Sequence, residues 1–378
     1  MSGAQPDHRD RYANALVGKK VCITGGAGFI GSHIASELLD LGADIAVIDD
    51  LSSSDGNHLW YLVETYPERV KFCFASILEN AALRQAVDGC EIVIHLAAMN
   101  SVPRSIEDPE RCFAVNTLGT VRVCAQALHA GARRLVLASS SSVYGDDPTL
   151  PKIESMQTNP ISPYAASKLA AEAVVGAWQH SYALPSVILR YFNVFGARQP
   201  ADSPYAGVVP AFLHNLIQGK PPVIYGDGSQ TRDFTHVSNV VSATLLAALA
   251  DTSAITCPIN IGCGKRTSVS DLAHHAAAAL DTPELKPLYK PARAGDVPHS
   301  VADISRAQEL LGYQPVKTLE QGLRETAAWM HRGAAAKSDP MDRLAETANN
   351  SEPAHQDASD GVNTPLSFPT PTPQTPTA

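Results

Sequence analysis

Residues 21–50 read VCITGGAGFIGSHIASELLDLGADIAVIDD, and this stretch decides the fold. The β-branched run at 21–24 predicts a short strand, and apolar residues at helical spacing predict a helix from Phe29 to Leu41 after the glycines. A second strand is expected at 44–48, and the acid Asp49 follows it. A strand, a glycine turn, a helix, a strand and an acid in this order are typical of a dinucleotide-binding unit.

The glycines of this unit have different expected roles. Gly25 allows a tight turn, Gly28 lets a diphosphate approach the backbone, and Gly31 lets the helix pack on its strand. The diphosphate is expected at the positive end of the helix. Asp49 follows at the distance where a carboxylate accepts hydrogen bonds from both ribose hydroxyls and repels a 2′-phosphate. We therefore expect NAD rather than NADP.

Strands and helices continue to alternate along the chain. Further strands are expected at 70–75, 92–96, 134–138, 186–189 and 258–261. Further helices are expected at 81–87, 109–130, 162–179 and 237–250. Such alternation predicts a Rossmann-type α/β fold with a doubly wound parallel sheet, whose ligands bind beyond the carboxyl ends of the strands.

The domain plan follows from these patterns. Residues 1–17 are expected to form an N-terminal extension, 18–190 the NAD-binding domain, completed by about 235–262, and 191–332 a smaller α/β domain. Residues 333–378 are polar and rich in Pro and Thr, and we expect a disordered tail there. Loops of the smaller domain are expected to carry Arg190, Arg232 and Arg293, whose guanidinium groups can hold a phosphate-bearing ligand.

Composition narrows the class of protein. The 378 residues carry a net charge of −9, which argues against nucleic acid as a partner. Seven cysteines without a CxxC pair are expected to be buried thiols in a reducing compartment. The first fifteen residues do not resemble a secretory signal, and no apolar run is long enough to span a bilayer. We expect a cytoplasmic protein with neither a membrane partner nor a metal site.

Two motifs supply a candidate catalytic set. ASSSSVYG at 138–145 contains Ser140, Ser141 and Ser142, and PYAASK at 163–168 contains Tyr164 and Lys168. A spacing of four places the phenol and the ammonium on one face of the predicted helix. A nearby positive charge favours the ionised phenol, so Tyr164 is a candidate general base.

Together, TGGAGFIG, Asp49, HLAA, ASSSSVYG, SPYAASK and RYFNVFG make residues 18–330 resemble the extended short-chain dehydrogenase/reductase family. Within that family the chain is most similar to the UDP-glucose and UDP-N-acetylglucosamine 4-epimerases. The resemblance implies that Tyr164 takes the proton from the sugar O4, that Ser140 bonds to the same oxygen, and that hydride passes from C4 to NAD. The 4-keto sugar then turns over and receives the hydride on its other face. Lys168 is expected to bond to the nicotinamide ribose and to lower the pKa of Tyr164.

The same resemblance implies the binding residues. Those implied for NAD are Gly25, Gly28, Phe29, Ile30, Gly31, Asp49, Ser76, Ile77, Leu96, Ala97, Ala98, Tyr164 and Lys168. The Ser76-Ile77 pair stands where the family usually has an aspartate and a hydrophobic residue beside adenine. Those implied for the UDP-sugar are Ser101, Ser140, Ser141, Ser142, Asn193, Gln199, Tyr225, Arg232, Arg293, Asp296 and Ser300.

Other reactions on this fold remain alternatives. Nucleotide-sugar dehydratases and decarboxylases carry carboxylates at the positions of Ser141 and Ser142, and serine cannot replace a carboxylate as an acid or base. Epimerisation is therefore expected, with UDP-glucuronate 4-epimerisation and a non-catalytic NAD-binding regulator as further alternatives.

The substrate and the assembly follow from the resemblance. The small Ser300 stands where a bulky residue would exclude an N-acetyl group, and Gln199, Asn193, Gly207 and the Asn100-Ser101 pair match N-acetyl-preferring epimerases. We expect UDP-N-acetylglucosamine and UDP-N-acetylgalactosamine ahead of UDP-glucose and UDP-galactose. A homodimer is expected through the helices at 109–130 and 163–181.

Overall fold

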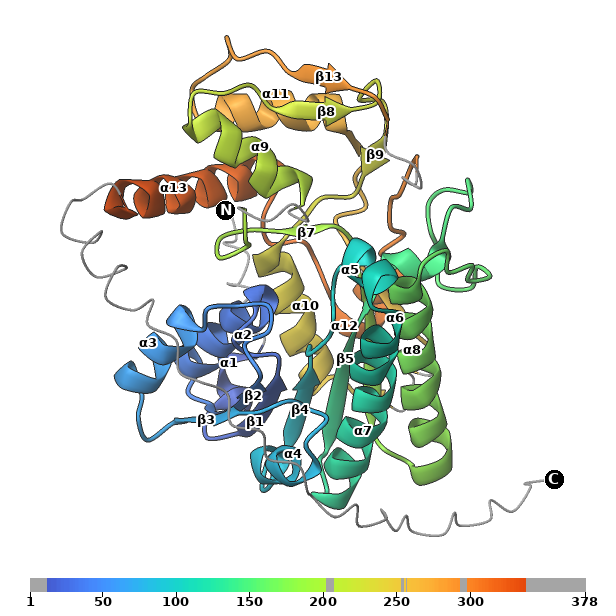
Figure 1. Cartoon of the computed structure of the whole chain (residues 1–378). Coiled ribbons are helices and arrows are strands. Elements are labelled where there is room, and N and C mark those ends of the chain that lie inside the picture. Colours follow the sequence, from blue (N-terminus) through green and yellow to red (C-terminus); the bar gives the residue numbers. More distant parts are fainter. Residues whose placement is uncertain (1–11, 202–206, 253–254, 256, 293–297, 338–378) are drawn as a thin grey trace, which may run out of the picture.

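The computed structural model describes residues 12–201, 207–252, 255, 257–292 and 298–337 (Figure 1). Within these residues the central sheet has seven strands in the order β11-β6-β5-β4-β1-β2-β3, and all neighbouring pairs are parallel. The strands are β1 Lys20–Thr24, β2 Asp44–Asp49, β3 Val70–Phe74, β4 Ile92–His95, β5 Arg134–Ser140, β6 Ser186–Tyr191 and β11 Ile259–Ile261. The doubly wound parallel sheet predicted from the sequence is confirmed.

Both faces of the sheet are covered by helices. On one face lie α2 Phe29–Asp40, α3 Asn57–Thr65 and α10 Val237–Leu249; on the other lie α4 Asn80–Val87, α7 Gly119–His129 and α8 Pro163–Tyr182 (Figure 1). Strands β4 and β6 are buried at every position, because helices exclude water from both sides. The short α1 Ala13–Leu16 adds the buried Tyr12 and Leu16 to this core, so the first domain begins before residue 18.

A smaller region lies beyond one end of the sheet (Figure 1). Its core is formed by α9 Val208–Ile217, α11 Val269–Ala279 and α13 Leu319–Lys337. Its strand pairs are β7 Val194–Phe195 with β10 Thr235–His236, β8 Val223–Tyr225 with β13 Leu288–Lys290, and β9 Thr231–Arg232 with β12 Thr267–Ser268. The remaining α12 Ser305–Leu311 packs against β11 and α10.

Several elements differ from expectation. The helix expected at 109–130 is three segments: α6 Pro109–Phe113, the π-helical η2 Ala114–Leu118, and α7. Helix α13 runs to Lys337, past the boundary expected at residue 332. Arg190 lies in β6 rather than on a loop. The helices α3, α5 Val102–Glu107, α9, α11, α12 and α13 are additions to the elements expected from the sequence.

Candidate active site

The glycine-rich turn joins β1 to α2 and has the geometry that a diphosphate requires. Gly25 has φ +74°, and a Cβ there would lie 2.6 Å from the Ala97 nitrogen. A Cβ on Gly31 would lie 2.2 Å from the Gly25 oxygen, so helix and turn touch. A Cβ on Gly28 would meet nothing in the described chain closer than 3.4 Å. The protein's own packing therefore allows a side chain at Gly28, and the backbone there is open to the close approach of a ligand.

The start of α2 also favours an anion. Its N-cap is Gly28, which offers no side chain to the first N–H groups of the helix. Phe29 and Ile30 follow in the first turn and are partly buried against the core. Free N–H groups and the helix dipole at such an end favour a phosphate group. The turn thus fits the diphosphate of NAD.

Asp49 ends β2 beside this turn. Its Oδ2 accepts a hydrogen bond from the Ala27 backbone at 2.9 Å, and its Oδ1 accepts one from the Leu51 backbone at 2.9 Å. Burial raises the pKa of the carboxyl, while these backbone donors lower it. Each oxygen retains acceptor capacity, because a carboxylate has about four acceptor positions. This arrangement suits the ribose hydroxyls that the sequence predicts as partners.

The remaining residues predicted for NAD lie at the ends of neighbouring strands. Leu96, Ala97 and Ala98 follow β4, and the Ala97 backbone donates to the Thr24 carbonyl at 3.0 Å. Ser76 is half-buried after β3. Ile77 is 3% exposed and packs against Gly119 of α7, so Ser76 is the more accessible member of the pair.

The candidate catalytic residues come from β5 and α8. Ser140 is the last residue of β5, and Tyr164 and Lys168 lie in the first two turns of α8. That helix begins at Pro163, and the side chain of Ser162 caps it by accepting the Ala165 N–H. The phenol of Tyr164 is hydrogen-bonded to the Ser140 side chain. Lys168 is buried and donates from Nζ to the Ala138 carbonyl at 2.9 Å.

The ionisation of this set differs from the sequence-based expectation. Burial raises the pKa of Tyr164, and the hydrogen bond with Ser140 lowers it. Burial also lowers the pKa of Lys168 to about 8, while Cys112 and Glu172 raise it. The expected lowering of the Tyr164 pKa by Lys168 is not seen in this structure, because loss of water around the phenol dominates and the Lys168 ammonium bonds to a backbone carbonyl.

Asn116 is a site residue that sequence reasoning missed. It lies in η2 and is 2% exposed. Its Oδ1 accepts from the Met99 backbone at 2.8 Å, and its Nδ2 donates to the Ser167 Oγ at 2.8 Å. Ser167 lies between Tyr164 and Lys168, so Asn116 joins the segment after β4 to the catalytic helix. The signal in the sequence was an asparagine, a poor helix former, inside the helix expected at 109–130.

Three residues predicted for the sugar carry buried polar atoms with no hydrogen-bond partner among the described residues. They are the Ser142 Oγ, the Asn193 Nδ2 and the Gln199 Oε1. Asn193 has φ +33° just after β6, and Gln199 donates from Nε2 to the Val194 carbonyl at 3.3 Å. Because buried polar groups normally have partners, these atoms mark a place where a polar ligand fits. Ser141 lies next to Ser142 in the short 3-10 helix η3 Ser141–Tyr144.

The smaller domain brings two more predicted residues together. The Ser300 backbone donates to the Thr231 carbonyl at 3.0 Å, and Arg232 donates from Nη1 to the same carbonyl at 2.9 Å. Tyr225 ends β8. Ser101 caps α5, where its Oγ accepts from the Arg104 backbone at 3.3 Å. Arg293 and Asp296 lie outside the described residues.

Arg190 was expected to bind a phosphate-bearing ligand from a loop, but in the structure it lies in β6 and is buried. It is 4% exposed and forms an ion pair with Glu172 of α8. No group of three or more His, Cys, Asp or Glu side chains in the described part of the chain could hold a metal ion. None of the described helices is long and apolar enough to cross a membrane.

Comparison with known proteins agrees with this geometry. A profile of the NAD dependent epimerase/dehydratase family matches residues 21–262. A UDP-glucose 4-epimerase from Mycolicibacterium smegmatis is 37% identical over 309 residues, which is 81% of this chain and 97% of the relative.

Two solved structures are also similar. The UDP-N-acetylglucosamine 4-epimerase of Methanobrevibacter ruminantium, in complex with UDP-N-acetylmuramic acid, is 35% identical with a TM-score of 0.77, over 84% of this chain and 99% of that one. The UDP-glucose 4-epimerase of Thermus thermophilus, in complex with NAD, is 32% identical with a TM-score of 0.73, over 83% and 99%. The chain thus belongs to the NAD dependent epimerase/dehydratase family, and its relatives include UDP-sugar 4-epimerases.

Proposed function

We propose that the protein epimerises C4 of UDP-linked sugars, interconverting UDP-N-acetylglucosamine and UDP-N-acetylgalactosamine, and more slowly UDP-glucose and UDP-galactose. The observation that carries this proposal is the hydrogen bond between Ser140 and Tyr164, with serines at 141 and 142 beside it. A hydroxyl and a phenol in contact can share the proton of the sugar O4. Chemistry at C5 would need a carboxylate at those two positions as acid or base.

Each side chain has one task in this proposal. NAD, when bound, supplies the acceptor and later the donor of the C4 hydride. Tyr164 removes the O4 proton and later returns it, and Ser140 orients the same oxygen. Because burial raises the pKa of Tyr164, the phenol needs a positive charge nearby to act as a base near pH 7. In this proposal Lys168, one helical turn further along α8, supplies that charge.

The proposed preference for N-acetylated sugars is based on Ser300, Asn193 and Gln199. Ser300 is a small side chain whose backbone is fixed to Thr231 next to Arg232, so a larger residue there would have little freedom to move aside. The unpartnered Asn193 Nδ2 and Gln199 Oε1 atoms are suited to a polar substituent. These features support room, and hydrogen-bonding capacity, for an acetamido group on C2.

The direct test is to incubate the purified protein separately with UDP-N-acetylglucosamine and with UDP-glucose, without added reductant, and to separate the products. Formation of the C4 epimers in both reactions, faster for the N-acetylated sugar, is the expected result. Preference for UDP-glucose would remove the role given to Ser300. A deoxy-keto or pentose product from another nucleotide sugar would overturn the epimerase assignment, and NAD binding without any product would favour a regulator.

We also propose that the protein is a homodimer that pairs through α6, η2, α7 and α8. Four large apolar side chains of α5, α6 and η2 are exposed on the single chain: Val102 at 39%, Ile106 at 64%, Phe113 at 39% and Leu118 at 45%. Apolar side chains that gather on neighbouring elements of a surface mark interaction sites more often than isolated ones do. A second copy of the chain, placed against these elements, would cover them.

A further inference from the structure

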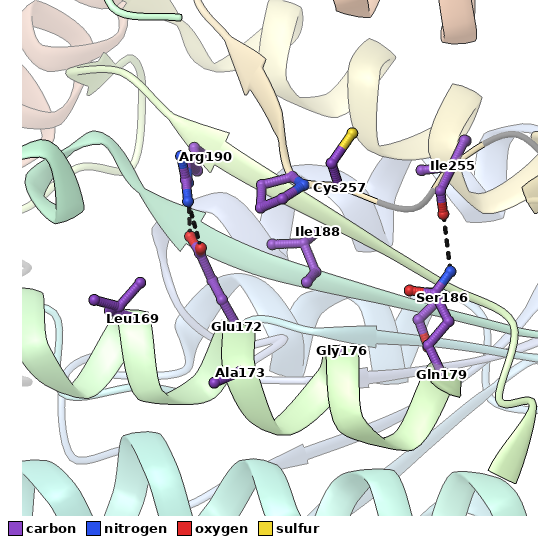
Figure 2. Close-up of a pocket in the computed structure, with 11 residues that line it drawn as sticks. Leu169, Glu172, Ala173, Gly176, Gln179, Ser186, Ile188, Arg190, Ile255 and Cys257 are labelled. Atoms are coloured by element: carbon purple, nitrogen blue, oxygen red, sulfur yellow. Dashed lines mark hydrogen bonds and ion pairs between the residues drawn. The ribbon is translucent and has the colours of Figure 1, made fainter. Parts of the chain in front are cut away.

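An ion pair lies buried behind the catalytic residues, between α8 and β6. Arg190 donates from Nε to the Glu172 Oε1 at 2.9 Å and from Nη2 to the Oε2 at 2.7 Å, and each side chain is 5% exposed. Figure 2 shows the pair joining helix to strand at one end of a cavity of about 290 Å³. Two parallel hydrogen bonds fix the planes of both groups, so the orientation of the carboxylate is well defined.

Glu172 reaches the catalytic set in two ways. The Ser139 Oγ donates to the Glu172 Oε1, and Ser139 directly precedes Ser140 in β5. Glu172 also follows Lys168 by four residues, so both side chains leave the same face of α8 one turn apart. One carboxylate is therefore linked to Ser140 through the strand and to Lys168 through its charge.

Arg190 is held from its other side as well. Its guanidinium carbon lies 4.8 Å from the centre of the Tyr144 ring, a distance typical of a cation–π contact. The Tyr144 hydroxyl donates to the Asn260 Oδ1 of β11 at 2.7 Å. The guanidinium thus sits between α8, β6 and a ring anchored to β11, and Glu172 cannot turn without disturbing these contacts.

We propose that Glu172, oriented by Arg190, is a positioning residue that keeps Lys168 charged and holds Ser140 in place for catalysis. This rests on the function proposed above, in which Lys168 supports Tyr164 as the base. A pair buried this deeply is expensive to form, because both charges lose their water. The pair lies next to Lys168 and Ser139, so a role in positioning the active site would explain why a buried ion pair is present despite this cost.

The charges around Lys168 support the proposal. Burial lowers the pKa of Lys168, whereas Cys112 on α6 and Glu172 on α8 raise it. His95 faces it from β4, and burial together with Lys168 lowers the His95 pKa to about 3, so this ring is neutral at pH 7. Glu172 is a carboxylate fixed in position by two hydrogen bonds from Arg190, and it lies one helical turn from Lys168, so its negative charge opposes the effect of burial.

The first test is a titration that needs no turnover. Lysines labelled with carbon-13 at Cε are followed by NMR in the full-length protein without cofactor, and Lys168→Met assigns the signal. In Glu172→Gln the midpoint of Lys168 should fall by about one pH unit, because an opposite charge is lost and Arg190 is left uncompensated. An unchanged midpoint would overturn the proposal.

Two further variants separate charge from packing. Gln179→Met alters the same helix at the other end of the same cavity, where Gln179 donates from Nε2 to the Ile255 carbonyl at 2.8 Å (Figure 2). It should lower thermal stability and leave the Lys168 midpoint where it is. The double variant Glu172→Gln/Arg190→Gln removes both charges and should give a midpoint between those of wild type and Glu172→Gln. It also carries the test if the single variant fails to fold.

Turnover supplies the second readout. If charged Lys168 is required, activity is lost as pH rises through its pKa, so the basic limb of kcat should move to lower pH in Glu172→Gln, with KM little changed. Glu172→Asp keeps the charge and should keep the wild-type limb. A wild-type protein that converts no nucleotide sugar would refute the proposed function instead, and the NMR titration would still decide the role of Glu172.

Discussion

Gly31→Ala should lower the free energy of unfolding. Gly28→Ala should leave the fold almost as stable and weaken NAD binding. At Gly31 the added Cβ would lie 2.2 Å from the Gly25 oxygen and 2.7 Å from the Gly26 Cα, so turn and helix must separate. At Gly28 the nearest described atom is 3.4 Å away, so the same methyl group fits in the free protein. The two positions are three residues apart and belong to the same turn, which makes each the control for the other.

The magnitudes follow from these distances. Overpacking at a site that cannot relax costs about 3 kcal/mol, and we expect this loss of stability for Gly31→Ala. For Gly28→Ala the loss should be about 1 kcal/mol or less, because the methyl group has room and the remaining cost is the poorer N-capping by alanine. NAD affinity should fall in Gly28→Ala, because the methyl group occupies space that the diphosphate needs. A clash of about 2 kcal/mol there corresponds to binding about 30-fold weaker.

Two assays on each protein check the prediction. Urea denaturation without cofactor gives the free energy of unfolding, and calorimetric titration with NAD gives the affinity. Equal loss of stability in both variants would refute the assignment of Gly31 as the packing glycine. Normal NAD affinity in Gly28→Ala would show that the diphosphate does not approach the backbone at this position.

The other predictions concern the chemistry, the substrate and the assembly. Tyr164→Phe should reduce kcat at least about 100-fold while NAD still binds, and near-normal turnover would remove the base role. Ser300→Tyr should slow conversion of the N-acetylated sugar more than that of UDP-glucose, whereas equal loss would place the selectivity elsewhere. Ile106→Glu combined with Phe113→Glu should give a folded monomer by light scattering. A dimer that persists would show that the chains pair through another surface.

The NAD-binding half could be predicted closely because its signals are local. Strands and helices of this half repeat their apolar residues with clear periods, and the glycine turn carries its own backbone requirement at Gly25. The catalytic set is also local, since Tyr164 and Lys168 share one helix and Ser140 ends the strand packed beside it. The glycine turn and the spacing of Tyr164 and Lys168 are each fixed within one short stretch of sequence, whereas the contact with Ser140 needs β5 and α8 to pack together.

The features that were missed depend on partners far away in the chain. From the sequence, Arg190 was expected to bind a phosphate group. In the structure it forms an ion pair with Glu172, and the sequence does not show that these two residues are in contact. Helix α9 was missed because Pro210 suggests a break, although proline is tolerated in the first turn, where it lies. The partners of Tyr225, Arg232 and Ser300 lie in the smaller domain, where short strands and irregular connections leave little periodicity to follow.

The π-helical segment η2 has a consequence for how this part of the chain can change in length. A π turn contains one more residue than an α turn, and Asn116, which contacts α8, lies within η2. Deleting one residue from 114–118 would convert the π turn into an α turn and leave α6 and α7 in phase. Val123 and Ala127 would then stay in the core, and the change would be confined to the segment that carries Asn116 and its contact with Ser167. The number of residues in η2 is therefore tied to that contact rather than to the packing of α7.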